Sequence, residues 1–428
     1  MLAGGKPDSF YSDYIIWPVV KILVLLFIIL TLVAYLVYLE RKVSAFIQAR
    51  LGPMRVGPWG LLQPAADGLK LLLKEDIIPL KADKIVFAIA PIIAVVSALV
   101  VLAVVPWGPA WATIANVNIG LLFILAVSSV GVLGLVLSGW SSNSKYSLLG
   151  ALRSSAQMVS YEVGMGLSII GALMFARTLS MNGIVEAQLA DRVWYVFFQP
   201  LGFLVYVVAA LGETNRAPFD LPEAESELVA GYHTEYSGFR WALFFMAEYT
   251  AMIVTSAVAV TLYLGGWSLF GVEHVFSNPT MRVVFGIVIF SLKIALLIYL
   301  YMWFRWTFPR YRYDQLMDLG WKWLIPAGLA NIVLTGVWYV LAMPKNEGGV
   351  LNLLRPGAGD RYQLSGWGII YFIATGFLIT IPLVWALLTA INRRSRTFNL
   401  HAQRQLQIQL RQERLGKRAE AQPAETAP

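Results

Sequence analysis

Long apolar runs, separated by short polar segments, repeat along almost the whole chain. A transmembrane α-helix needs about 20 consecutive apolar residues to cross roughly 30 Å of hydrocarbon. Nine runs have about this length: Ile15–Leu39, Ile85–Val105, Val117–Ser138, Ser155–Phe175, Val193–Leu211, Trp241–Leu264, Val283–Phe304, Leu324–Met343 and Gly366–Ala390. The pattern therefore predicts an all-α, polytopic membrane protein with about nine transmembrane helices.

The composition agrees with a membrane protein and narrows its chemistry. Of the 428 residues, 58% are hydrophobic and only 14% are charged, whereas soluble domains carry about 25% charged residues. The chain has no cysteine, which excludes disulfides, iron–sulfur ligation and catalytic thiols. Its three histidines, His233, His274 and His401, are predicted to lie far apart. We therefore expect no metal site and no catalytic residue, and any electron carrier would belong to other subunits.

Lysine and arginine indicate the orientation, because basic loops stay on the cytoplasmic side of a membrane. Most of the 33 basic residues follow the first, third, fifth, seventh and ninth runs. The N-terminus is thus predicted outside and the C-terminus in the cytoplasm. The net charge of +8 is explained mainly by this asymmetry and by contact with anionic lipid, so we expect no nucleic-acid binding.

The predicted helices and loops divide the chain into seven segments. These are an outer N-terminus with the first helix (1–39), a cytoplasmic loop with an amphipathic helix (40–84), helices two to five (85–211), an acidic cytoplasmic loop (212–240), helices six to eight (241–343), an outer loop with the ninth helix (344–391) and a basic cytoplasmic tail (392–428).

The first cytoplasmic loop contains a predicted amphipathic helix. Pro64 suits its first turn. Asp67, Lys70 and Lys74 then fall on one face, while leucines cover much of the rest. Such a helix lies along a membrane surface. It either anchors the loop only, or it directs its charges into the protein beside an apolar floor, which would suit a ligand with a polar head and an apolar tail.

The second loop is acidic on a side of the membrane that is otherwise basic. Its acids are Glu213, Asp220, Glu223, Glu225, Glu227 and Glu235, opposed by Arg216 and Arg240. Asp220 followed by Pro222 is typical of a helix start, and it would place Glu223 and Glu227 on one face. The loop is either folded into the membrane domain or exposed as a solvated acidic face.

Three charged residues fall well inside predicted spans: Glu162, Glu248 and Lys293. A charge at the centre of a bilayer costs about 2.5–3.5 kcal/mol on insertion scales, so such residues face protein or water. They either form a buried Glu–Lys pair that fixes helix packing, or they belong to a path for protons.

Several motifs identify a family. The chain contains ERK, GLLQPAADGLKLLLKE, GALRSSAQMVSYEVG, ETNRAPFDLPEAESELVAGYHTEYSG, ALFFMAEYT and PRYRYDQLM, in that order, within residues 40–343. In these motifs the chain resembles the H subunit of bacterial NADH:quinone oxidoreductase, respiratory complex I. The ninth run and the basic tail carry no motif of that family.

The resemblance implies a role at the joint between the hydrophilic redox arm and the proton-pumping membrane arm. It implies a chamber for ubiquinone or menaquinone, the substrate, bordered by Arg41, Asp67, Lys70, Arg216, Phe219 and Asp220. It also implies a chain of charged residues that couples quinone reduction to proton translocation, namely Glu162, Glu213, Glu223, Glu225, Glu227, Glu248 and Lys293. The implied location is the bacterial cytoplasmic (inner) membrane, and the implied partners are the subunits of both arms, including the one with the last iron–sulfur cluster.

Two other functions remain open at this point. The buried acids and lysine would also suit a self-contained cation/proton transporter. The chain would also suit the homologous subunit of a membrane-bound hydrogenase, where no quinone is bound, because those relatives share much of the acidic loop.

Overall fold

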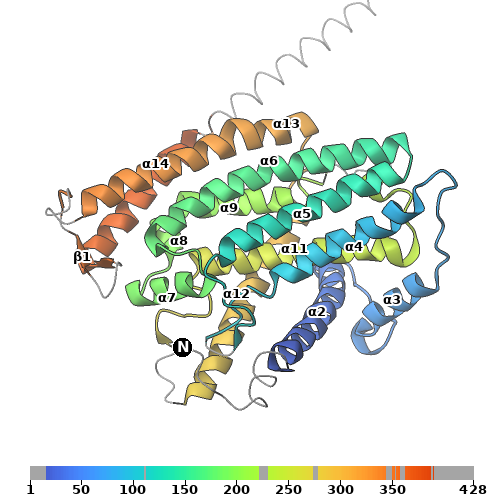
Figure 1. The fold of residues 1–428 in the computed structure, drawn as a ribbon, viewed down its shortest axis with the longest axis horizontal. Helices are drawn as coiled ribbons and strands as arrows, with labels where there is room; N and C mark the ends of the chain where they lie inside the picture. Colours follow the sequence, from blue (N-terminus) through green and yellow to red (C-terminus); the bar gives the residue numbers. More distant parts are fainter. Residues whose placement is uncertain are drawn as a thin grey trace, which may run out of the picture. The chain divides into compact units, whose positions relative to one another are not determined.

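The structure is a computed structural model that describes residues 16–109, 112–220, 230–272, 278–343, 349–351, 353–356, 362–386 and 389. The chain divides into two units, Met1–Gly376 and Phe377–Pro428, and the elements labelled in Figure 1 belong to the first. Glu223, Glu225 and Glu227, the predicted helix start after Asp220 and the basic tail lie outside the described residues.

The fold is all-α and polytopic, as predicted. In the described ranges, eight helices are long and apolar enough to cross a membrane. They are α2 (Trp17–Ile47), α4 (Lys84–Val101), α5 (Gly120–Ser141), α6 (Lys145–Ala176), α11 (Gly238–Tyr263), α12 (Pro279–Thr307), the continuous helix Tyr313–Ala342 and Gly366–Ala386. The helix Tyr313–Ala342 consists of α13 (Tyr313–Leu319), a π-helical turn (Gly320–Leu324) and α14 (Ile325–Ala342). A small antiparallel hairpin pairs β1 (Leu354–Pro356) with β2 (Tyr362–Leu364).

The fifth predicted span is not one continuous helix. Residues 193–211 instead form a short α8 (Tyr195–Phe198) and α9 (Pro200–Glu213). The break falls at Gln199, with φ −126° and ψ 52°, because the ring of Pro200 disfavours the α conformation for the residue before it. At 1.5 Å per residue, the 14 residues of α9 cover only about 21 Å.

Several helices extend beyond their predicted apolar runs. Helix α2 continues to Ile47 and α6 begins ten residues before the predicted run, at Lys145. Apolar runs measure only the part of a helix that hydrocarbon surrounds, so polar ends that stay helical are missed. The extension of α2 is important for the site, because it places Glu40 and Arg41 on a rigid helix.

The amphipathic helix of the first loop is present as α3 (Gln63–Leu73), with Pro64 in its first turn. It contacts α2 and α11, and Figure 1 shows it beside α2. Leu69, Leu72 and Leu73 are exposed. In addition, α7 (Met181–Asp191), which was not predicted, follows α6 and is capped by the Ser180 side chain.

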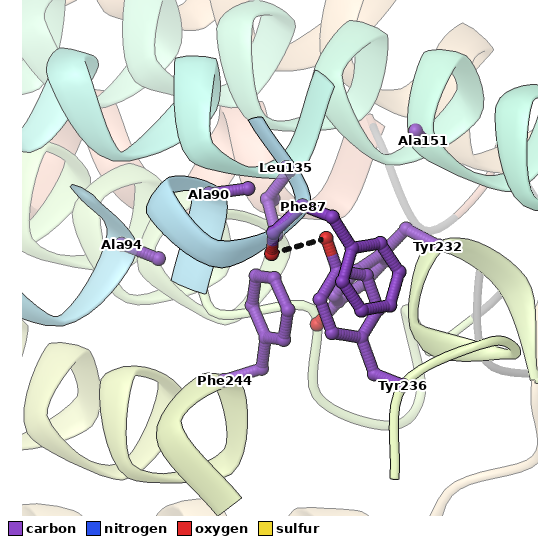
Figure 2. Close-up of a cluster of buried hydrophobic side chains, with 8 residues drawn as sticks. All are labelled: Phe87, Ala90, Ala94, Leu135, Ala151, Tyr232, Tyr236 and Phe244. Carbon is purple, nitrogen blue, oxygen red and sulfur yellow. Dashed lines mark hydrogen bonds between the residues drawn. The ribbon is translucent and has the colours of Figure 1, made fainter. Parts of the chain in front are cut away.

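The last part of the acidic loop, from residue 230 onward, folds into the helical core. Its 3₁₀ turn η4 (Gly231–His233) contacts α5 and α6. Figure 2 shows Tyr232 and Tyr236 in a buried cluster with Phe87 and Phe244. The rings of Tyr236 and Phe87 stack with centroids 3.9 Å apart, and the Tyr236 hydroxyl donates to the Phe87 carbonyl at 3.2 Å. At least this part of the loop is therefore not a solvated face.

Candidate functional site

A buried carboxylate, Glu40, joins four parts of the chain. Its side chain lies near the end of α2 and is only 7% exposed. The Arg216 guanidinium, from the segment after α9, donates through Nη1 to Glu40 Oε2 at 3.0 Å and to Oε1 at 3.2 Å. Arg305, at the end of α12, also pairs with Oε1, and the Tyr249 hydroxyl of α11 donates to Oε2. We call Glu40, Arg216, Arg305 and Tyr249 the Glu40 cluster.

The Glu40 cluster combines one carboxylate with two guanidinium groups in a mostly buried place. Arg216 is 5% exposed and lies over the Tyr249 ring, with its Cζ 4.1 Å from the ring centroid. Its Nε and Nη2 have no hydrogen-bond partner among the described residues. A buried charge needs partners that satisfy its hydrogen bonds. The cluster therefore offers unused donors and a net positive charge to a polar ligand.

Arg216 is among the residues that the family motifs predict for the site, whereas Glu40 is not. The residue follows the first apolar run directly and was assigned to the loop. A helical signal for it does exist, since Val33, Leu36, Glu40 and Ser44 are spaced by three or four residues and all are buried on one side of α2. Continuing the helical period through the polar end of the helix would have placed Glu40 on the buried face.

Arg41 and Asp67, both predicted, meet beside the Glu40 cluster. Arg41 Nη1 lies 2.8 Å from Asp67 Oδ2, and Gln63 donates to Asp67 Oδ1 at 3.0 Å. These contacts fix α3 against the end of α2. Lys70, on the same helix, is exposed and forms no ion pair within the described parts of the chain.

Phe219 and Asp220 lie in a segment that α6 holds in place. Gln157 of α6 donates through Nε2 to the carbonyls of Gly212 and Phe219, at 2.8 and 2.9 Å. The Phe219 ring packs against Tyr161 and Tyr311. Asp220 pairs with Arg310 at 3.2 Å. Burial raises the pKa of the Asp220 carboxyl, and the positive charge of Arg310 opposes this shift only partly.

Glu213 and Glu248 line one partly open cavity. Its volume is about 90 Å³, and polar lining groups come from Ser128, Thr214 and Asn215. The Tyr232 hydroxyl donates to Glu248 at 2.8 Å. Glu213 Oε2 is buried and has no hydrogen-bond partner among the described residues. Most of the cavity lining is apolar, but its volume leaves room for an ordered water beside the two carboxylates, and such a water would complete these hydrogen bonds.

Glu162 extends this acidic group along α6. It is half-buried, accepts a hydrogen bond from Ser129 of α5, and its charge acts on Glu213. Glu248 in turn interacts electrostatically with Arg216 and Asp220. Glu162, Glu213 and Glu248 therefore form a series that leads toward the Glu40 cluster. We call these three residues the acid series.

Lys293 is placed elsewhere. Its ammonium donates to the carbonyls of Leu264, Gly266 and Ser268 at 2.6–2.9 Å, and it lies 4.4 Å from the Trp194 ring centroid. Leu264 directly follows the last residue of α11 and lies 16 residues after Glu248. At 1.5 Å per residue, the backbones of Glu248 and Leu264 are about 24 Å apart. The structure therefore does not bring Lys293 together with Glu248.

The described residues include no group of three or more His, Asp or Glu side chains that could hold a metal ion. The arrangement is that of a polytopic helical membrane protein with a buried ion cluster beside an amphipathic surface helix. Comparison with known sequences identifies it further. A profile of the NADH dehydrogenase family matches residues 20–336.

Individual relatives agree with the profile. The chain is 46% identical over 402 residues to the first H subunit of the NADH-quinone oxidoreductase of Koribacter versatilis, covering 78% of this chain and 94% of the relative. It is 50% identical over 352 residues to the second H subunit of Geobacter metallireducens, covering 78% and 97%. The corresponding H subunit of Bacillus mycoides is 49% identical over 335 residues, covering 78% and 96%. The chain belongs to the family of NADH-quinone oxidoreductase H subunits, membrane subunits of an enzyme complex.

Proposed function

We propose that this subunit binds the quinone of the complex, ubiquinone or menaquinone, between α2, α3 and the segment 216–220. The observation that carries this proposal is the Glu40 cluster, with unused Arg216 donors, directly beside the Arg41–Asp67 pair. Lys70, Phe219 and Asp220 would border the same chamber. The exposed leucines of α3 supply the apolar surface that a lipid-like tail needs.

The polar groups suit a quinone head. Its two carbonyl oxygens accept hydrogen bonds, and guanidinium groups are strong donors. Reduction to the quinol takes two electrons and two protons. Because this chain has no cysteine, the electrons would come from a cluster held by the hydrophilic arm, which would dock on the cytoplasmic side of the membrane.

We further propose that the acid series carries the effect of quinone reduction toward the proton-pumping membrane arm. Two observations support this: Glu213 and Glu248 line the same cavity, and Glu248 interacts electrostatically with Arg216 and Asp220. Neighbouring carboxylates resist ionising together, so a change of charge at the quinone redistributes their protons. Glu223, Glu225 and Glu227 belong to the same proposal, while the contacts of Lys293 give its part no support.

The relatives' names favour the quinone enzyme over the hydrogenase homologue and the self-contained transporter. In this proposal the complex lies in the bacterial cytoplasmic membrane, with the N-terminus of this chain outside.

Glu40→Gln tests the quinone site. It removes the negative charge that two guanidinium groups share, and breaking such a buried pair costs about 3–5 kcal/mol. In membranes that contain the assembled complex, we expect NADH:quinone activity to fall at least tenfold, while NADH oxidation by an artificial acceptor at the hydrophilic arm is kept. Glu186→Gln, at an exposed position on α7, is the matched control. Normal quinone activity in Glu40→Gln would contradict the proposal, and equal loss with both acceptors would indicate failed assembly.

A further inference from the structure

An apolar groove runs along α2, between this helix and α11 and α12. Its volume is about 820 Å³, and its α2 wall extends from Trp17 to Val43. At 1.5 Å per residue this wall is about 39 Å long, enough to cover the hydrocarbon thickness of roughly 30 Å. The groove is therefore long enough to cross the hydrocarbon of a bilayer, and it ends near Glu40 at one side and near Trp17 at the other.

The end of the groove near Trp17 contains a charged side chain, whereas the rest of the described lining is uncharged. Lys21 is the only charged lining residue in the described part of the chain, and Trp17, one turn before it on α2, also lines the groove. Lys21 is half-buried, and its ammonium forms no ion pair within the described ranges. Tryptophan at such a place is typical of the boundary between acyl chains and headgroups.

One cation at the end of a long apolar groove matches a molecule with an anionic end and long apolar chains. An unfilled groove would cost the dispersion contacts of its walls. A quinone has no anionic group to pair with the Lys21 ammonium, whereas an anionic phospholipid has both a charged phosphate and long apolar chains. Charge complementarity thus favours lipid over quinone at this end.

We propose that the half of this groove nearer Trp17 is a binding site for an anionic phospholipid of the surrounding bilayer. The phosphate is bound by Lys21, and an acyl chain lies between α2 and α12, against Ile287 and Ser291. The site is separate from the proposed quinone chamber, which lies beyond the other end of the groove.

The test uses the whole complex in nanodiscs of phosphatidylcholine with about 20 mol% phosphatidylglycerol, an anionic lipid that basic residues attract. After detergent extraction, mass spectrometry counts the phosphatidylglycerol retained per complex. We expect Lys21→Gln to lower the affinity for this lipid about fivefold, the usual effect of one basic residue. Ser291→Trp, which fills the groove without changing charge, should remove the same lipid. Lys145→Gln, at an exposed lysine outside the groove, should retain it.

Equal retention in wild type and in both groove variants would overturn the proposal. A quinone with a photoreactive group on its tail provides the second arm. If it labels residues 17–25 and phosphatidylglycerol does not compete, the groove holds a quinone tail, and the lipid site is rejected. Failure of the Glu40→Gln prediction would leave the lipid result unaffected, because lipid retention is measured without turnover.

Discussion

Single residues show where sequence patterns are informative and where they fail. Arg41, Asp67 and Arg216 could be named from their motifs, and the structure places them around the end of α2. Glu40 was missed because an apolar run ends one residue before it, although its helical spacing from Val33 and Leu36 indicates a buried position. Hydropathy detects the part of a helix that lipid surrounds. It cannot detect a carboxylate whose burial depends on arginines 176 and 265 residues away.

His233 is predicted to make the stability of the complex depend on pH. Its ring packs against Tyr232, and burial lowers its pKa below the usual value of 6.5, although Glu248 opposes this. The folded state therefore binds a proton less readily than the unfolded state does. Stability is then complete above about pH 6.5 and falls as the pH decreases toward the folded pKa.

His233→Phe tests this, because it keeps a ring against Tyr232 but cannot be protonated. The thermal midpoint of the detergent-solubilised complex is measured from about pH 7.5 to about pH 5.5, a range that brackets the usual histidine pKa. We expect the wild-type midpoint to decrease more steeply below about pH 6.5 than that of the variant, by a few degrees at most. Parallel curves for the two proteins would show that His233 carries no part of this dependence.

At the scale of elements, the apolar runs predicted the long helices because the thickness of the bilayer sets their length. The fifth run failed for a local reason: hydropathy does not register that Pro200 breaks the helix at Gln199. At this break the Gln199 side chain donates to Thr335 and accepts from Asn331 of α14, at 2.8 Å each. Helix α7 was missed because it is short and too polar to form an apolar run.

Helix α6 and the turn η4 approach each other so closely that only glycine fits at their contact. A Cβ on Gly150 would lie 2.6 Å from the Gly231 Cα atom, which is backbone and cannot move aside easily. Gly231 itself has φ +60°, so the turn depends on glycine there too. We expect Gly150→Val to separate η4 from α6 and to cost about 1–3 kcal/mol through overpacking.

The readout for Gly150→Val is the amount of assembled complex on a native gel and its thermal midpoint. Gly166→Val is the matched control, because it is on the same helix and a Cβ there meets nothing within 4 Å. If both variants assemble and melt alike, the close approach of α6 and η4 has no importance for the fold.

At the scale of the whole molecule, the polar groups of the first unit lie in separate places. The Glu40 cluster and the Arg41–Asp67 pair lie where α2 leaves the apolar region, while the acid series lies between α5, α6 and α11. Lys293 instead holds the loop after α11. In the proposed coupling of these two polar groups, Glu248 would be the link, because it interacts electrostatically with Arg216 and Asp220.

Glu248→Gln is therefore predicted to affect proton translocation more than electron transfer. Glutamine keeps an acceptor for the Tyr232 hydroxyl, so the cavity should stay formed. The variant cannot release or take up a proton, so the acid series is interrupted between Glu213 and the Glu40 cluster.

In proteoliposomes, the rate of proton uptake is measured together with NADH:quinone turnover. We expect the number of protons moved per quinone reduced to decrease by at least half. Glu186→Gln should keep the wild-type ratio, and an unchanged ratio in Glu248→Gln would remove the residue from the coupling path, whatever its effect on turnover.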